Sequence, residues 1–228
     1  MCGRFTLTQS AETLAAAFNL ADPPQVAPRY NIAPTQPIAV IRAPAQDPEQ
    51  LSRREFTYLT WGLVPSWAKD PKIGARLINA RAETVAEKPS FRAAFKRRRG
   101  LIVADGFYEW QRTPEGKQPY YFQLENHRPF AFAGLWERWE NGNGDVIESA
   151  VIITTVANEV LNPIHERMPV ILEPEDYDDW LDSTVEKGQH LQALLRPYQA
   201  KIMVSFPVST AVNNPRHDSP DCIQPLAT

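Results

Sequence analysis

The chain has 228 residues, of which 43% are hydrophobic, 22% are charged and 10% are aromatic, and its formal net charge is −3. This apolar content is enough for a folded core, and it excludes a mainly disordered, collagen-like or coiled-coil protein. No run approaches the ~20 apolar residues that a membrane helix needs, so we expect no membrane partner.

The first predicted element is a short helix over 11–18, which Ser10 can cap and which is rich in helix-forming residues. Five prolines between residues 22 and 37 predict an ordered but irregular loop. Strands are predicted over 38–42, 56–63, 101–104, 120–124, 130–135 and 149–156. Further helices are predicted over 90–98, 174–181 and 188–195, and the sequence of residues 140–145 predicts a turn between two strands.

The predicted strands outnumber the helices and do not alternate with them, which argues against a doubly wound parallel sheet. The sequence therefore predicts an α+β fold: one compact domain over residues 1–228, with antiparallel or mixed sheets in a barrel-like arrangement and short flanking helices. Cys2 and Cys222 are the only cysteines and cannot form a disulfide framework, so a reducing cytoplasm is the expected location.

Charge is distributed unevenly along the chain. Residues 69–112 contain eleven Lys or Arg and five Asp or Glu, whereas residues 173–190 contain seven acidic residues and one Lys. A basic segment in an acidic chain is typical of a protein that binds a polyanion with one face. The same pattern fits a solvated helix that ends in the four cations at 96–99, because cations suit a helix C-terminus. Charge alone leaves both interpretations open.

Cys2 directly follows the initiator Met1. If Met1 is removed, residue 2 carries an α-amine and a thiol whose ordinary pKa values, about 7.7–8.0 and about 8.5, leave a fraction of each nucleophilic near neutral pH. Such an aminothiol can form an imine with an aldehyde and then close a thiazolidine ring. The alternative is a small packed residue with no chemical role.

Two other segments contain groups suited to proton transfer. Glu109 lies among aromatic residues in Gly106–Trp110, where a partly dry carboxyl would favour its protonated form; the alternative is a strand with Glu109 facing water. His165 lies between Pro163 and Pro169 and is therefore predicted on a constrained loop, where a positioned acid or base could act.

Period-two spacing puts Asn79, Arg81 and Glu83 on one face of an extended segment. Trp67 lies near prolines and could stack on a nucleic acid base, whereas Trp61 is predicted in the core. The chain has none of the usual metal or nucleotide motifs, so no metal and no cofactor is expected, and the remaining histidines receive no role.

Six segments taken together resemble the SOS response-associated peptidase (SRAP) family, although each alone is a weak signal. They are Met1–Phe5, Tyr30–Pro34, Trp61–Trp67, Asn79–Thr84, Ala104–Trp110 and Ile164–Pro169. The similarity continues through Ala211–Asn214 and Cys222–Pro225 and so spans nearly the whole chain.

The resemblance implies a compact α+β domain with a positively charged cleft, and a protein that senses abasic sites in single-stranded DNA and crosslinks to them. It implies that Cys2 is the nucleophile after loss of Met1 and that Asn79, Glu109 and His165 line the pocket. It also implies contacts with DNA. Phosphates would be bound by Arg4, Arg81 and Arg167, and Asn31 would contact the DNA backbone or the region of Cys2. Trp67 and Pro34 would stack on bases beside the lesion.

The family name further implies peptidase activity, which we interpret as self-removal of the residue before Cys2, and the imine chemistry allows a lyase side reaction. We expect a monomer whose partner is single-stranded DNA and which, in a bacterium, associates with the nucleoid. Two alternatives remain: a thiol peptidase that uses Cys2 and His165 on other proteins, and a module that binds single-stranded DNA without a covalent bond.

Overall fold

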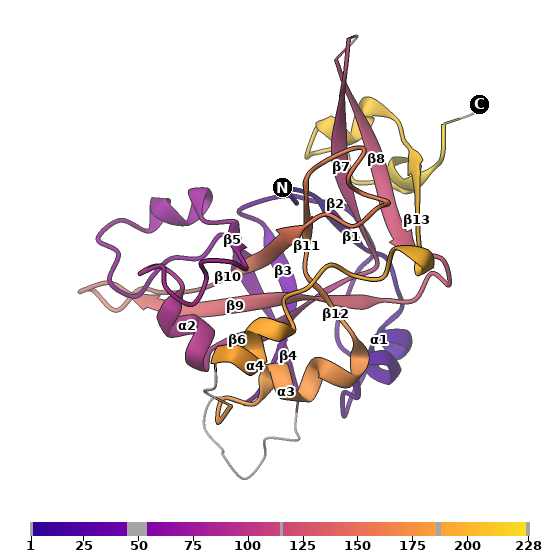
Figure 1. Cartoon of the computed structure of the whole chain (residues 1–228). Coiled ribbons are helices and arrows are strands. Elements are labelled where there is room, and N and C mark those ends of the chain that lie inside the picture. Colours follow the sequence, from indigo (N-terminus) through magenta and orange to yellow (C-terminus); the bar gives the residue numbers. More distant parts are fainter. Residues whose placement is uncertain (1, 45–53, 115, 186–187, 227–228) are drawn as a thin grey trace.

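Figure 1 shows the computed structural model, which describes residues 2–44, 54–114, 116–185 and 188–226. These residues form two β-sheets with short helices around them, as the α+β prediction requires. Within the described ranges, no helix has the length and apolar character needed to cross a membrane. The assignment of residues 1–228 to one domain stays a prediction.

Five strands of the larger sheet form a closed ring. They are β3 (Pro37–Arg42), β4 (Glu55–Trp61), β6 (Arg99–Ala104), β9 (Phe130–Glu140) and β10 (Val146–Val156). β10 pairs in parallel with β4, whereas the β4–β3, β3–β6, β6–β9 and β9–β10 pairs are antiparallel. The predicted barrel-like arrangement of mixed strands is therefore confirmed, and its closure leaves none of the five as a free edge.

Three short strands pair with β9 and β10 and so extend the sheet of the barrel. β5 (Asn79–Arg81) and β11 (Arg167–Pro169) pair with the C-terminal half of β10, and β12 (Ile171–Leu172) pairs with β9. β5 and β11 lie on opposite edges of β10, where Thr154 pairs with both Arg81 and Pro169, so residues about 90 positions apart in the sequence lie only one strand apart.

The second sheet is antiparallel and has the order β13-β8-β7-β1-β2. Its strands are β1 (Phe5–Leu7), β2 (Arg29–Ile32), β7 (Gly106–Thr113), β8 (Gly116–Leu124) and β13 (Met203–Pro207). β7 and β8 form a long hairpin that projects from the molecule at the top of Figure 1.

The core lies where the two sheets meet and joins aliphatic side chains with a group of aromatic ones. Phe5 from β1 packs edge-to-face on Trp61 at 5.1 Å and on Phe132 at 5.7 Å between ring centroids. All three side chains are fully buried, which confirms the predicted core position of Trp61. Each such pair contributes about 0.5–1.5 kcal/mol beyond simple burial, so these contacts fix the N-terminal strand against the barrel.

The α-helices are short and lie around the barrel. They are α1 (Ala11–Phe18), α2 (Arg92–Arg97), α3 (Tyr177–Leu181) and α4 (Gly188–Ala193). Short 3-10 helices occur at η2 (Pro71–Arg76), η3 (Pro174–Asp176), η4 (Ala200–Ile202), η5 (Thr210–Asn213) and η6 (Pro220–Ile223). As predicted, Ser10 caps α1 by accepting a hydrogen bond from the Thr13 amide, and Leu14 and Phe18 face the core.

Three expectations about local structure need correction. The proline-rich segment 22–37 is not irregular throughout, because Arg29–Ile32 forms β2. Asp218 lies along the outer edge of this strand, where its carboxylate accepts hydrogen bonds from the backbone amides of Tyr30 and Asn31. The strand predicted over 56–63 ends at Trp61, because Gly62 adopts a φ of 129° where a Cβ atom would lie 2.5 Å from the Gly74 carbonyl oxygen.

The cation run at 96–99 is only in part a solvated helix end: Lys96 and Arg97 are exposed in the last turn of α2, whereas Arg98 is half-buried and Arg99 is buried. Arg99 is buried at the start of β6, where its guanidinium donates to main-chain carbonyls of the α2 and α3 ends, including Phe95 and Trp180. Arg98 forms an ion pair with Glu137 at 2.6 Å. Two of the four cations therefore stabilise the fold, because they satisfy helix carbonyls and a buried carboxylate.

Candidate active site

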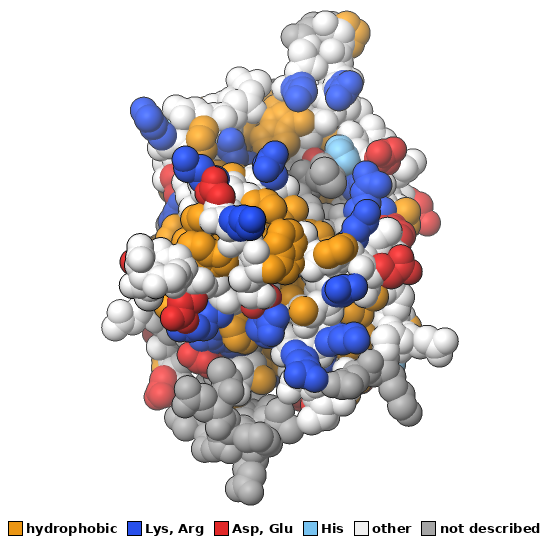
Figure 2. Space-filling model, turned by 90° about the vertical axis from the view of Figure 1, so that its left-hand side faces the viewer, with side chains coloured by type: hydrophobic (Ala, Val, Ile, Leu, Met, Phe, Trp, Pro, Cys, Tyr) orange, Lys and Arg blue, Asp and Glu red, His pale blue; other side chains and the backbone are white. Residues whose placement is uncertain are grey.

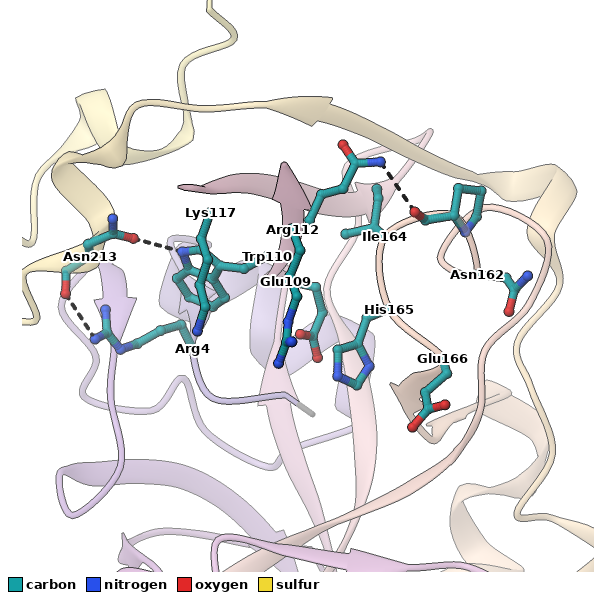
Figure 3. A pocket seen from close by; sticks show the side chains of 12 residues that line it. Arg4, Glu109, Trp110, Arg112, Lys117, Asn162, Ile164, His165, Glu166 and Asn213 are labelled. Carbon is teal, nitrogen blue, oxygen red and sulfur yellow. Dashed lines mark hydrogen bonds between the residues drawn. The ribbon is translucent and has the colours of Figure 1, made fainter. Parts of the chain in front are cut away.

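A solvent-open cleft of about 890 Å³ lies between the base of the β7–β8 hairpin and the loop that joins β10 to β11. Figure 3 shows polar side chains from four separate segments pointing into it. The residues that line this cleft include Arg4, Glu109, Trp110, Arg112, Lys117 and His165.

Glu109 lies on β7 with only 2% of its surface exposed, so the alternative in which it faces water is wrong. Its neighbours Tyr108 and Trp110 point away from it because side chains alternate along a strand. Burial raises the pKa of the Glu109 carboxyl, and the nearby His165 partly offsets this. A carboxyl of this kind is suited to hold a proton and release it during a reaction.

His165 lies on the β10–β11 loop, as predicted, beside the Glu109 carboxyl (Figure 3). Its Nδ1 lies 3.0 Å from the amide nitrogen of Arg167 and 3.1 Å from the carbonyl oxygen of the same residue. A neutral ring that carries its proton on Nε2 accepts from that amide at Nδ1, and a neutral ring that carries its proton on Nδ1 donates to that carbonyl. The main chain therefore orients the imidazole in either tautomer, and Nε2 is the ring nitrogen on the side away from Arg167.

Cys2 is fully buried and is not one of the residues that line the cleft, but it lies close enough to Glu109 to interact with its charge. The Nδ2 of Asn79 on β5 donates to the Cys2 carbonyl oxygen at 2.8 Å, and the thiol lies 3.9 Å from the Arg4 carbonyl oxygen. Burial, together with the negative charge of Glu109, raises the pKa of the Cys2 thiol far above its ordinary value. In this state the thiol is protonated. Met1 lies outside the described residues.

The structure therefore brings the four predicted catalytic residues together from two strands, one loop and the segment before β1. Asn79 anchors Cys2, Cys2 lies within electrostatic reach of Glu109, and Glu109 in turn interacts with His165. The arrangement joins a thiol, a buried carboxyl and an oriented imidazole, which are the groups needed for nucleophilic attack with proton transfer.

Arg4 and Asn31 form a network that ties the N-terminal strand to the C-terminal segment. Arg4 Nη1 donates to Asn31 Oδ1 at 2.9 Å and to the Val212 carbonyl oxygen at 2.6 Å. Asn31 is fully buried, and its Nδ2 donates to main-chain carbonyls of the same segment, including that of His217 at 2.7 Å. Asn31 thus presents no surface to DNA in this structure; it positions Arg4, which does line the cleft.

Arg81 and Arg167 lie on strands that each pair with β10, but they differ in availability. Arg81 is exposed, whereas Arg167 is held by Glu83 through two hydrogen bonds of 2.6 and 3.0 Å and donates to the Thr154 carbonyl oxygen. Arg167 lowers the pKa of the Glu83 carboxyl by these hydrogen bonds. A phosphate that binds Arg167 must therefore compete with Glu83.

Trp67 lies on the 62–90 segment, at the left of Figure 1, and 58% of it is exposed. It borders a groove of about 380 Å³ with the cations Lys69, Lys72 and Arg76. Figure 2 shows Lys and Arg side chains spread over this face around a central group of hydrophobic side chains. Pro34 is half-buried on another loop. An exposed indole beside cations is the surface that stacks on a base while a phosphate is neutralised.

Three cleft residues were not predicted from the sequence. Trp110 donates to Asn213 Oδ1 at 2.7 Å, and Arg112 lies directly opposite Lys117 across the hairpin. Like charges in that register repel one another, so the pair favours an anion between them. If residues 106–124 had been recognised as one hairpin, its register would have placed Arg112 opposite Lys117, next to the last pair, Thr113 with Gly116.

Comparisons with known proteins add three findings. A model of the family "SOS response associated peptidase (SRAP)" matches residues 1–215. The chain is 43% identical to the abasic site processing protein YoqW of Bacillus subtilis, covering 98% of this chain and 99% of that protein. It is 30% identical to the abasic site processing protein HMCES of Xenopus tropicalis, covering 98% and 78%.

A crystal structure of a protein from Bacteroides thetaiotaomicron has the same fold, with a TM-score of 0.87, 24% identity, and coverage of 99% of this chain and 100% of that one. A second, from Bordetella bronchiseptica, gives a TM-score of 0.76 at 26% identity, with coverage of 91% and 100%.

Proposed function

The chain belongs to the SOS response-associated peptidase family, and we propose that within it the protein processes abasic sites in single-stranded DNA by forming a covalent bond through Cys2. The observation that supports this proposal is that the buried Cys2 lies within electrostatic reach of Glu109, which lines an open cleft together with His165. The names of the relatives support the choice of abasic DNA as substrate.

The proposed reaction begins with the abasic deoxyribose, which is mostly a closed hemiacetal. His165 at the cleft wall transfers a proton from the sugar hydroxyl to the ring oxygen, which opens the ring to the aldehyde. Removal of Met1 makes the α-amine of Cys2 terminal, and this amine adds to the aldehyde carbon. The resulting carbinolamine loses water and becomes an imine.

The thiol then closes the ring. Glu109, whose pKa burial raises, first donates the proton that the departing water needs, which leaves a protonated imine and a Glu109 carboxylate. The sulfur then bonds to the imine carbon, the electron pair of the C=N bond moves to nitrogen, and the thiol proton returns to Glu109, so a thiazolidine forms without any oxidant. Asn79 holds the Cys2 carbonyl in place during both steps.

The trapped product protects the DNA strand. An open imine acidifies the neighbouring carbon and permits β-elimination of the phosphate, which is the proposed lyase side reaction. Ring closure removes the imine and therefore suppresses strand cleavage. The same cleft would remove Met1 from its own chain, which is the peptidase activity that we propose from the family name.

We propose that the DNA strand lies across the cationic face of Figure 2 and enters the cleft at the lesion. Arg81 and the cleft cations neutralise phosphates, and Arg167 joins them when a phosphate displaces Glu83. Trp67 offers its exposed ring to a base beside the lesion, with Pro34 as a second stacking surface. Because these contacts address phosphates and ring faces, we expect little dependence on DNA sequence.

The direct test is incubation of the protein with single-stranded DNA that carries one abasic site, followed by a denaturing gel. We expect a band that survives heating in denaturant. Cys2→Ala keeps the amine, so it should give a stable band only when borohydride reduces the imine. A wild-type protein that binds this DNA without any stable band would favour the non-covalent binding module, and cleavage of unrelated proteins would favour the thiol peptidase.

A further inference from the structure

We propose that His217, Asp221 and Cys222 form a binding site for one Zn²⁺ ion. Among the residues that the structure describes, this group brings one imidazole nitrogen, one carboxylate oxygen and one thiol sulfur within 4.8 Å of one another. The site lies in the C-terminal segment, and neither its chemistry nor its test depends on the proposed reaction with DNA.

Local structure explains why these three side chains converge. The turn η6 (Pro220–Ile223) folds the chain back so that residues four and five positions after His217 face it. His217 Nε2 lies 2.7 Å from Asp221 Oδ2, and the Cys222 thiol donates to the His217 carbonyl oxygen at 3.4 Å. Asp218, between them, points the other way and pairs with Arg29 of β2. The segment is therefore anchored at its centre while its other polar groups face one another.

The set of donor atoms selects the ion. Thiolate and imidazole are ligands of Zn²⁺, whereas Mg²⁺ and Ca²⁺ prefer an all-oxygen set. Cys222 is fully buried against Tyr108 and Val212, which supplies a dry wall behind the sulfur. Asp221 is exposed and His217 is partly exposed, so a fourth position opens to solvent and can take water.

Binding requires only small side-chain movements. Three ligand atoms at about 2.0–2.3 Å from Zn²⁺ in tetrahedral geometry lie about 3.3–3.7 Å apart. The His217–Asp221 contact must therefore open by less than about 1 Å, and the sulfur must approach by a similar amount. Cys222 binds as the thiolate, so its proton leaves to solvent when the metal enters.

The ion would act on the cleft through the chain itself. The residues just before the site present the carbonyls that hold Arg4 and Asn31, namely those of Val212, Asn213, Asn214 and His217. Asp218 holds the amides of β2 from inside the same loop. A metal that fixes 217–222 therefore stabilises the support of Arg4, and it raises the melting temperature of the folded chain by an amount that grows with the logarithm of its affinity.

The test is metal content and spectroscopy on untagged full-length protein that carries Cys2→Ser, so that only one thiol remains. After treatment with a chelator and addition of Zn²⁺, we expect about one tightly held ion per chain and a rise in melting temperature. Co²⁺ in its place should give the near-ultraviolet sulfur-to-cobalt band of a bound thiolate.

Matched variants decide the assignment. Cys222→Ser should abolish the cobalt band, and His217→Gln, at a partly exposed position that should not disturb folding, should abolish stoichiometric retention. His190→Gln is the control, because His190 forms a similar 2.8 Å pair with Asp179 but is not part of the mixed-donor group. Retention below one ion per chain, a cobalt spectrum without the thiolate band, or equal losses in the His217 and His190 variants would overturn the proposal.

Discussion

Asn79 offers the clearest separation between positioning the nucleophile and binding DNA. Its Nδ2 donates to the carbonyl oxygen of the fully buried Cys2 at 2.8 Å. An ordinary internal hydrogen bond contributes about 1 kcal/mol, and loss of the donor beside a buried acceptor costs up to about 3 kcal/mol. At about 1.4 kcal/mol for each factor of ten, Asn79→Ala should slow crosslinking about 5- to 140-fold.

The assay compares two quantities for the same variant. Single-turnover crosslinking to abasic DNA should slow by that factor, while equilibrium binding of an unreactive tetrahydrofuran analogue should stay nearly constant. Asn79→Asp, which keeps the shape but cannot donate, should also be slow. The control is Gln192→Ala, because Gln192 is another half-buried amide that donates to a carbonyl, that of Ala82, at 2.6 Å. Equal slowing in both alanine variants would refute a specific positioning role.

Three further predictions follow from the cleft and its border. Burial raises the pKa of Glu109, so the folded chain loses stability as pH rises through that pKa. The melting temperature of the Glu109→Gln variant should therefore exceed that of wild type by more at about pH 8 than at about pH 4. A difference that stays constant with pH would contradict this. His165→Ala should slow crosslinking about 10²- to 10⁴-fold with the affinity for the unreactive analogue retained, whereas equal losses would make His165 a binding residue. Glu83→Gln should free Arg167 and raise single-strand affinity about two- to fivefold at low salt, because Glu83 is half exposed and the pair is worth only about 0.5–1 kcal/mol; unchanged affinity would show that Arg167 does not meet phosphate.

Local signals in the sequence account for the elements that were predicted correctly. The helix over 11–18 has its cap and its apolar spacing in adjacent residues, and the turn at 140–145 joins two strands whose alternation is visible directly. Each of these signals depends on residues within a few positions of one another.

The elements that sequence analysis missed depend on distant partners. β5, β11 and β12 have only two or three residues and exist because β10 and β9 pair with them. Closure of the barrel likewise depends on β9 pairing on both sides, which no local pattern reports. Arg99 appeared to be a surface cation because its carbonyl partners come partly from α3, about 80 residues away.

The residues of the candidate site were predicted from sequence motifs, whereas the contacts between these residues were not predicted. Those motifs named Cys2, Asn79, Glu109 and His165, which do lie together, but not the hydrogen bond by which Asn79 holds Cys2. Two predicted DNA contacts are occupied by the protein itself, since Asn31 is buried in the network around Arg4 and Arg167 is held by Glu83. Such competition within the chain is not visible in a sequence.

The central claim is that the amine and the thiol of Cys2 act together once Met1 is gone. Its most direct test pairs a mass spectrum of the intact protein with the crosslinking gel, using one preparation that retains Met1 and one that lacks it. We predict a heat-stable crosslink only from the chain that begins at Cys2, because only there do both groups belong to the terminal residue. Efficient, heat-stable crosslinking by a protein that uniformly carries Met1 would contradict the thiazolidine mechanism and indicate a simple thiol nucleophile.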